Sequence, residues 1–169
     1  YRHHLSEQLL RFRGIRYLMS EWVRKAVIDR LNAVHMHVDA KEAIEGLSDE
    51  EAKMDPYEGG RSPKEFLYHI VFWQDFEYDM LRGTVHEVKK GSDWDVGSET
   101  WDGLVERFNI GLEGLLSIAT NWDMDKEIKI TETVSTRVGP ALLGISQHTS
   151  YHLGQLVTTR KALGKWSKD

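Results

Sequence analysis

The sequence contains no cysteine. This absence excludes disulfide bonds, metal sites built on thiolates and a cysteine nucleophile. A metal ion bound by this chain would therefore need histidine, aspartate or glutamate ligands. Any thiol chemistry would need a thiol that arrives on another molecule.

Long apolar runs are also missing. No stretch approaches the roughly 20 consecutive apolar residues that a membrane-spanning helix needs. The opening YRHHLSEQLLRFRGIRYLM has no uninterrupted apolar segment of the kind found in signal peptides. We therefore expect no membrane partner and a cytoplasmic location.

Positive charge is scarce outside the first 30 residues. Residues 1–30 contain seven Lys/Arg and three Asp/Glu, which leaves 15 basic and 24 acidic residues in the rest of the chain. An acidic body repels phosphate backbones, so we expect no nucleic-acid partner and interpret 1–30 as a basic helical extension with a solvated face. The 169 residues, 40% of them hydrophobic, suffice for one core, and we expect a single domain over 1–169.

Helix start and stop signals recur along the chain. The motif SPKE at 62–65 combines an N-cap serine, a proline at the first helical position and a glutamate that can reach back, and Gly83 can end this helix. A Gly-Pro pair at 139–140 opens the last helix, and Gly164 can end it. Weaker start signals lie at 39–42 and 48–51.

Apolar residues spaced by three and four positions predict two further helices. One covers 98–119, and the other is a first long helix that carries Leu31, Val34 and Val38. The alternating β-branched stretch at 127–138 predicts a short strand or an extended connection. Because the loop at 86–97 is long, we expect an all-α four-helix bundle with at least one long crossover connection.

Three histidines fall on the inward faces of the predicted helices. His148 and His152 lie one turn apart, at roughly 6 Å of rise, on the apolar face of the last helix. His69 lies on the apolar face of the helix that begins at 62–65. Two imidazoles at this spacing, with a third from a facing helix, form a three-histidine cup with an open position. We therefore expect these residues to hold one metal ion.

Packing is the alternative for each of these side chains, because a single histidine on an apolar face is more often a hydrogen-bonded core residue than a ligand. Three uncoordinated imidazoles together would leave several polar atoms to satisfy away from water, which favours a metal. The other histidines lack such an arrangement, and we expect none of them to be a primary ligand: His3, His4, His35, His37 and His86.

The candidate site lacks an obvious protein base. No phosphate-binding loop, nucleophile elbow or dinucleotide fingerprint is present, and Thr149 stands where an H-E-x-x-H zinc site has glutamate. Glu77 lies on the apolar face of the same helix as His69, about 12 Å beyond it. We expect Glu77 to pair with an Arg or Lys at the edge of the core; a catalytic role in proton transfer is the alternative.

Two segments resemble the DinB/YfiT-like family of metal-binding four-helix bundles. GGRSPKEFLYHIVFWQ resembles the family's Ser-x-x-Glu helix start followed by a histidine, and GISQHTSYHLGQL resembles its H-x-x-x-H-x-G-Q motif. The resemblance covers roughly 34–163 and implies a DinB-like bundle there, with 1–30 as an extra basic N-terminal helix.

The resemblance also implies a metal triad of His69, His148 and His152, with nickel or zinc as the divalent ion, and a homodimer. Members of the family include transferases that use low-molecular-weight thiols such as bacillithiol, a thiol-dependent isomerase, and proteins described as metal-dependent hydrolases. The resemblance does not identify the small-molecule substrate of this chain.

Two activities follow from such a site. Three neutral imidazoles leave a divalent ion its full charge, so a thiol or a water at the open position would lose its proton. We prefer S-transfer from a thiol cosubstrate to an electrophile, with hydrolysis as the second activity. The alternative is a non-enzymatic, stress- or damage-inducible bundle in which the metal only ties helices together, although such a site would need a fourth protein ligand.

Residues around the ligands could orient them. Gln147, Tyr151 and Gln155 are candidates for this role. Gln147 and Tyr151 fall outside the inward arc of the helix, and we expect them to lie at the surface or at a dimer contact.

Overall fold

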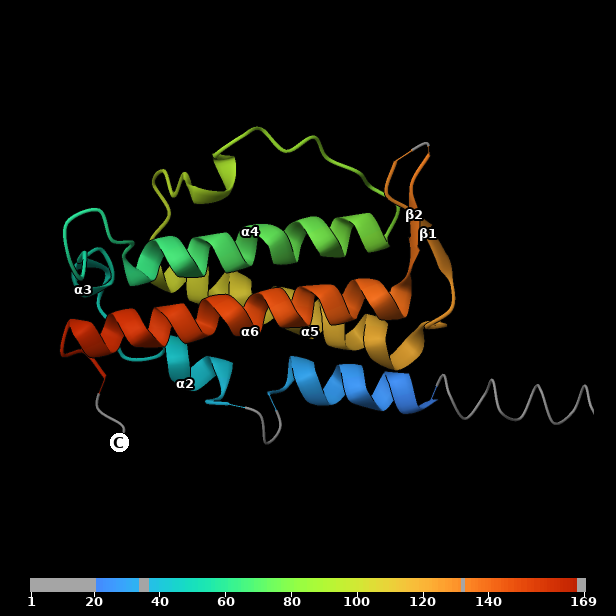
Figure 1. Cartoon of the computed structure of the whole chain (residues 1–169), viewed down its shortest axis with the longest axis horizontal. Helices are drawn as coiled ribbons and strands as arrows, with labels where there is room; N and C mark the ends of the chain where they lie inside the picture. Colours follow the sequence, from blue (N-terminus) through green and yellow to red (C-terminus); the bar gives the residue numbers. More distant parts are fainter. Residues whose placement is uncertain (1–20, 34–36, 132, 167–169) are drawn as a thin grey trace, which may run out of the picture.

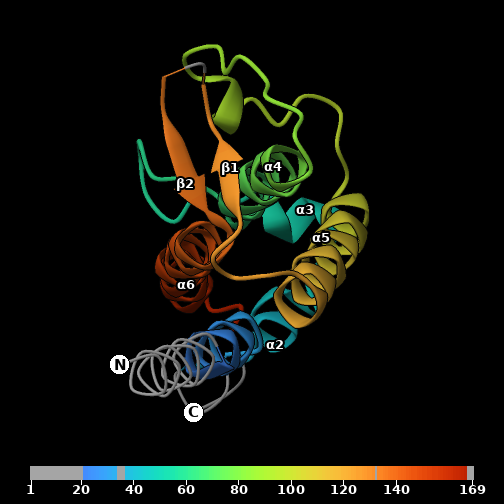
Figure 2. The same cartoon turned by 90° about the vertical axis from the view of Figure 1, so that its right-hand side faces the viewer.

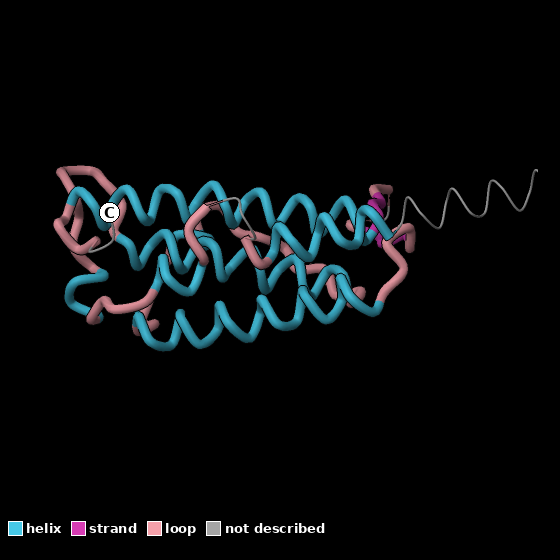
Figure 3. Tube along the Cα trace, turned by 90° about the horizontal axis from the view of Figure 1, so that it is seen from below, coloured by secondary structure: helices cyan, strands magenta, loops and turns pink. Residues whose placement is uncertain are grey.

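Four of the helices lie side by side along one axis in the computed structural model, which describes residues 21–33, 37–131 and 133–166 (Figures 1 and 3). Viewed along this axis, α4 and the first helix lie opposite each other, with α5 and α6 on the two sides between them (Figure 2). The four are the helix at 21–31, α4 (Pro63–Leu81), α5 (Trp101–Asn121) and α6 (Val138–Ala162). The predicted all-α four-helix bundle is confirmed.

Short elements connect the bundle helices. In the antiparallel hairpin, Ile128 pairs with Thr136, and the two strands close one end of the bundle (Figure 1). The segment predicted to be extended, 127–138, therefore contains two short strands, and its last residue begins α6. The short elements are α2 (Ala40–Ile44), α3 (Asp49–Ala52), η1 (Ser92–Trp94), β1 (Glu127–Lys129) and β2 (Ser135–Arg137).

The connection between α4 and α5 crosses the length of the bundle. It leaves the end of α4, returns along the outside of that helix and only then enters α5, so the two helices run in the same direction (Figure 1). Helix α6 runs back beside them, antiparallel to both. The predicted long crossover is confirmed, and it carries η1 onto α4.

Local sequence sets both ends of α4. The Ser62 side chain accepts from the backbone N–H of Glu65 at 3.3 Å, and the Glu65 carboxylate accepts from the Ser62 N–H at 2.9 Å. Pro63 occupies the first helical position, where its missing N–H has no cost. Gly83 follows the C-cap with φ 94°, a left-handed conformation that glycine adopts without strain. The predicted helix is confirmed.

The other long helices begin close to their predicted starts. Helix α5 begins at Trp101 because the Thr100 hydroxyl accepts from the Gly103 N–H at 3.1 Å. Helix α6 begins one residue before the Gly-Pro pair, directly after β2, and ends at Ala162 before Gly164, whose φ is 67°. None of the helices in these described ranges combines the length and apolar character that a bilayer span requires.

The first helix ends earlier than predicted. It ends at residue 31, and Ala33 follows with φ 54°, so the helix does not continue to Val38, which lies in a bend. The Asp39 side chain accepts from the Lys41 N–H at 2.7 Å and starts α2 as a separate helix. The N-cap signal at 39–42 therefore prevails over the helical spacing of Leu31, Val34 and Val38. Val34 itself lies outside the described residues.

The described part of the predicted basic extension packs against the bundle. Val27 is fully buried, and Arg24 donates from Nη1 to the Ala119 carbonyl at 2.6 Å. The expected boundary at residue 30 therefore falls within the first bundle helix. The remainder of the predicted extension, 1–20, lies outside the described residues.

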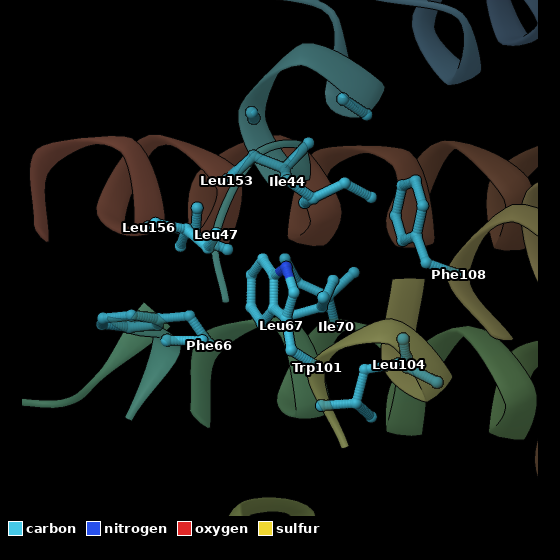
Figure 4. Close-up of a cluster of buried hydrophobic side chains, with 14 residues drawn as sticks. Ile44, Leu47, Phe66, Leu67, Ile70, Trp101, Leu104, Phe108, Leu153 and Leu156 are labelled. Carbon is cyan, nitrogen blue, oxygen red and sulfur yellow. The ribbon is translucent and has the colours of Figure 1, made fainter. Parts of the chain in front are cut away.

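The core consists of two clusters along the bundle axis. The first lies between α4, α5, α6 and α2, and Trp101 and Phe108 are its largest fully buried side chains (Figure 4). The second lies nearer the hairpin and includes Val27, Leu115 and Leu142. Together they bury the apolar faces that the helical spacing predicted.

An ion pair between buried Lys64 and partly exposed Asp49 joins three helices at the end of the bundle away from the hairpin. Asp49 of α3 accepts from Lys64 of α4 and from the Trp101 N–H of α5, both at 2.7 Å. The Lys64 side chain is only 7% exposed, so it depends on this carboxylate for its charge partner.

Candidate metal centre

Helices α4 and α6 bring the three predicted ligands together. His69 lies on α4, and His148 and His152 lie one turn apart on α6, which is antiparallel to it. One ring nitrogen from each histidine can be chosen so that all three atoms lie within 4.8 Å of one another. Across the described ranges, these three residues form the only group of histidine and carboxylate side chains close enough to share an ion.

The spacing between the rings suits a shared ion. Nε2 of His69 and Nε2 of His148 face each other at 3.2 Å. Two nitrogens bound tetrahedrally to one ion at about 2.05 Å would lie about 3.3 Å apart. The ring centroids of His148 and His152 lie 4.5 Å apart, and those of His69 and His152 lie 4.4 Å apart.

Oxygen acceptors fix the tautomer of two rings. The Asp93 carbonyl can only accept, so Nδ1 of His69 carries the hydrogen and donates to it at 3.1 Å, with the Asp93 carboxylate 3.3 Å away. Nδ1 of His152 likewise donates to Oε1 of Gln155 at 2.7 Å. Both rings therefore present an Nε2 lone pair, which is the arrangement of histidines that bind metals.

The histidines leave polar atoms unsatisfied in the protein alone. Nδ1 of His148 is buried and has no hydrogen-bond partner among the described residues. The facing Nε2 atoms of His69 and His148 can share only one hydrogen. Buried polar atoms without partners are costly, and an ion bound by Nε2 of each ring would offset this cost, although Nδ1 of His148 would still lack a partner in the described part of the chain. The residues present thus fit a divalent ion.

Burial keeps the three rings uncharged. Burial, together with the neighbouring His152 and His69, lowers the pKa of His148 to about 4. Burial is also the main cause that lowers the pKa values of His69 and His152. At neutral pH all three rings are therefore in the form that can donate a lone pair.

The crossover connection covers His69. The Trp94 ring of η1 stacks on the His69 ring, with centroids 3.9 Å apart and planes at 13°. The Arg61 guanidinium lies over the Trp94 ring at 3.7 Å and pairs with Glu65 at 2.8 Å. The roles of Asp93, Trp94 and Arg61 were not predicted, because nothing local in the sequence shows where a long connection meets a helix. The length of that connection was the available signal.

Further aromatic rings surround the cluster. Phe66 and Tyr151 lie beside His152, with centroid distances of 6.3 Å and 4.9 Å, and Trp73 lies 6.2 Å from His148. Of the three candidates for orienting a ligand, only Gln155 contacts one directly through a hydrogen bond. Gln147 is exposed and Tyr151 is 65% exposed, as expected from their positions on the helix.

Glu77 does not have the Arg or Lys partner that we expected. Among the described residues no hydrogen bond or ion pair reaches its carboxylate, and burial alone raises its pKa to about 7. The predicted pairing is therefore not found among the described residues, whose basic side chains do not reach this carboxylate. A role for Glu77 in proton transfer stays a prediction.

The remaining described histidines have other partners. His37 donates from Nδ1 to the Val38 carbonyl at 2.7 Å and contacts the Ser150 hydroxyl at 3.0 Å. His86 pairs with Asp79 at 2.8 Å on the surface. His3, His4 and His35 lie outside the described residues.

Comparison with known proteins gives the family. No curated protein and no solved structure matches the chain. The model of the DinB superfamily matches residues 25–156, which include the first bundle helix from Lys25 onward, all of α4 and α5, and all three histidines. This span is well over half of the 169 residues. The chain therefore belongs to the DinB superfamily.

Proposed function

We propose that His69, His148 and His152 hold one divalent ion, nickel or zinc, and that the protein is a metal-dependent enzyme which transfers a small thiol to an electrophilic substrate. The observation that carries this proposal is the convergence of three imidazole nitrogens within 4.8 Å from two antiparallel helices. The fixed tautomers of His69 and His152 support it, since both rings direct their lone pairs to the cluster.

The chemistry needs an open ligand position. An ion held by three neutral imidazoles keeps its full charge and strongly acidifies a thiol or a water in its remaining position. A structural site would fill that position with a fourth protein ligand, and the cluster in the described ranges has only three. This count favours an enzyme over a bundle that is only stabilised by metal.

The protein's own residues would orient the ligands and limit water. The Asp93 carbonyl and the Gln155 amide hold the hydrogens on Nδ1 of His69 and His152. Trp94 covers one face of the His69 ring, and Phe66 lies beside His152. Because the chain has no cysteine, the thiol must be a cosubstrate.

Metal content tests the site directly. Protein incubated with Ni²⁺ or Zn²⁺ and then desalted is expected to retain about one ion per chain by mass spectrometry. His148→Ala is expected to lower retention on the order of tenfold or more. His86→Ala is the matched control, because His86 is exposed and lies with Asp79 away from the cluster. Equal metal content in the two variants would overturn the proposal.

Activity assays then distinguish thiol transfer from hydrolysis and from a bundle without enzymatic activity. The loaded protein is expected to conjugate small thiols to electrophiles in a metal-dependent reaction, and His148→Ala is expected to lose this activity. Metal-dependent cleavage of esters or amides without any thiol transfer would instead identify a hydrolase. Bound metal with neither reaction would identify the non-enzymatic bundle.

A further inference from the structure

A groove of about 320 Å³ lies beside His152, between α6, the first turn of α4 and the loop that precedes α4. Its volume is at the lower end of the range for small-molecule sites. Two of its lining residues contact the candidate ligand: Phe66 packs near the His152 ring, and Gln155 accepts from its Nδ1. The groove therefore adjoins the candidate metal centre.

The side chains that line the groove are uncharged, and three of them are aromatic. The lining contains no Asp, Glu, Lys, Arg or His, and its polar atoms are hydroxyls and one side-chain amide. Two of its rings, Tyr57 and Tyr151, are 70% and 65% exposed, so both are open to a ligand from solvent. The full lining is Pro56, Tyr57, Phe66, Tyr151, Gly154, Gln155, Thr158, Thr159 and Ala162.

Gly154 keeps part of this groove open. It lies in the interior of α6, where glycine costs about 1 kcal/mol relative to alanine. A Cβ built at this position would meet no atom within 4 Å, so packing within the chain does not require glycine here. Gly154 lines the groove, so a large side chain at this position is expected to reduce its volume.

We propose that this groove binds the planar, uncharged part of an aromatic substrate and places its electrophilic end toward His152. Aromatic rings stack favourably on planar groups, and a site without ionic groups penalises charged ligands because it leaves them unpaired. This inference rests on the proposed function for its electrophile, but ligand binding to the groove needs no metal, since protein atoms alone form it.

The test compares two glycines of the same helix. Gly154→Leu fills the groove, whereas Gly144→Leu is the matched control, because Gly144 is equally free of neighbours and lies ten residues earlier, about 15 Å away along α6. Both changes favour helix formation, so both variants are expected to fold. Nitrobenzene serves as the uncharged probe and nitrobenzoate as its anionic analogue, with affinities measured by ligand-observed NMR on metal-free and metal-loaded protein.

Nitrobenzene is expected to bind the wild type more tightly than nitrobenzoate does. Gly154→Leu is expected to weaken nitrobenzene binding by about tenfold, and Gly144→Leu to change it by less than about twofold. Tyr57→Ala, an exposed loop variant, is expected to weaken binding without changing the helix. Unchanged nitrobenzene affinity in Gly154→Leu, or equal affinity for the two probes, would overturn the inference. Metal content of the same samples reports separately on the proposed function.

Discussion

At the residue scale, one hydrogen bond sets the orientation of the His152 ring. Nδ1 donates to Gln155, and this bond determines that Nε2 faces the other two histidines. The helical spacing of His148, His152 and Gln155 predicted the orientation of these side chains, because all three lie on one continuous helix. The acceptor for His69 could not be predicted, since Asp93 reaches it from a distant connection.

Removal of the Gln155 acceptor is expected to weaken metal binding without unfolding the bundle. In Gln155→Leu the His152 ring loses its orientation and its preferred tautomer, and the affinity for the ion is expected to fall by about 10- to 100-fold. Competition with a chelating dye measures this change. Gln147→Leu, on the exposed face of the same helix, is the control and should retain wild-type affinity. A similar loss in both variants would show that Gln155 has no specific role.

Glu77 is expected to make stability fall as pH rises. Its pKa is raised by burial from 4.5 to about 7 in the folded protein, so the folded state holds this proton more tightly than the unfolded state. The associated stability is present below pH 4.5 and is lost as the pH rises to about 7. Glu77→Gln removes this dependence and is expected to gain about 2 kcal/mol over the wild type between pH 5 and pH 8 in urea unfolding.

A surface carboxylate provides the comparison. Glu113→Gln changes an exposed residue of α5 and is expected to leave the pH dependence of unfolding as in the wild type. If Glu77→Gln behaved in the same way, the raised pKa of Glu77 would be refuted. If Glu77 also transfers a proton, Glu77→Gln would lower turnover while the bound metal stayed constant.

Local signals account for most of the predicted elements. The starts of α4 and α5 depend on side chains within three residues of the cap, which is why the sequence reveals them. The end of the first helix was missed because the apolar spacing continues beyond residue 31 to Val38. The cap at Asp39 instead starts a separate helix, α2. The stack of Trp94 on His69 depends on the path of the whole crossover, and no local pattern encodes that path.

Asp49 is expected to hold α3, α4 and α5 together. Its contacts to Lys53, Lys64 and the Trp101 N–H, in that order of importance, hold the pKa of its carboxyl well below the ordinary value of 3.8. Its contribution to stability is therefore complete above pH 3.8 and is lost as the pH falls toward the lowered pKa. Asp49→Asn is expected to lower the Tm at pH 7, because it leaves the buried Lys64 without a charge partner.

Unfolding at acidic pH gives a second measurement of how Asp49 holds α3, α4 and α5 together. Asp49→Asn should lose stability less steeply than the wild type below pH 4, since one of the carboxylates that must be protonated is gone. Asp102→Asn, an exposed acidic residue in the first turn of α5, is the control. Identical Tm values for Asp49→Asn and the wild type at pH 7 would contradict a structural role for the ion pair.

For the whole molecule, the proposed ion would act as a crosslink between α4 and α6. Ligand that binds only the folded state stabilises it, by about 2.7 kcal/mol when free ion is at 100 times Kd. For a chain of this size the Tm is expected to rise by about 5–10 °C on addition of metal. His148→Ala should show no rise. An equal rise in both proteins would indicate that the metal binds elsewhere.

The positions of the ligands along the chain affect when the site can form. His69 and His148 are 79 residues apart, and α5 with its crossover must be made between them. During synthesis the N-terminal part of a chain emerges first, so the early histidine is available long before its two partners on α6. A growing polypeptide can therefore offer a metal only one of the three donors until α6 emerges, and capture of the proposed ion would mark completion of the bundle rather than an early step of its biogenesis.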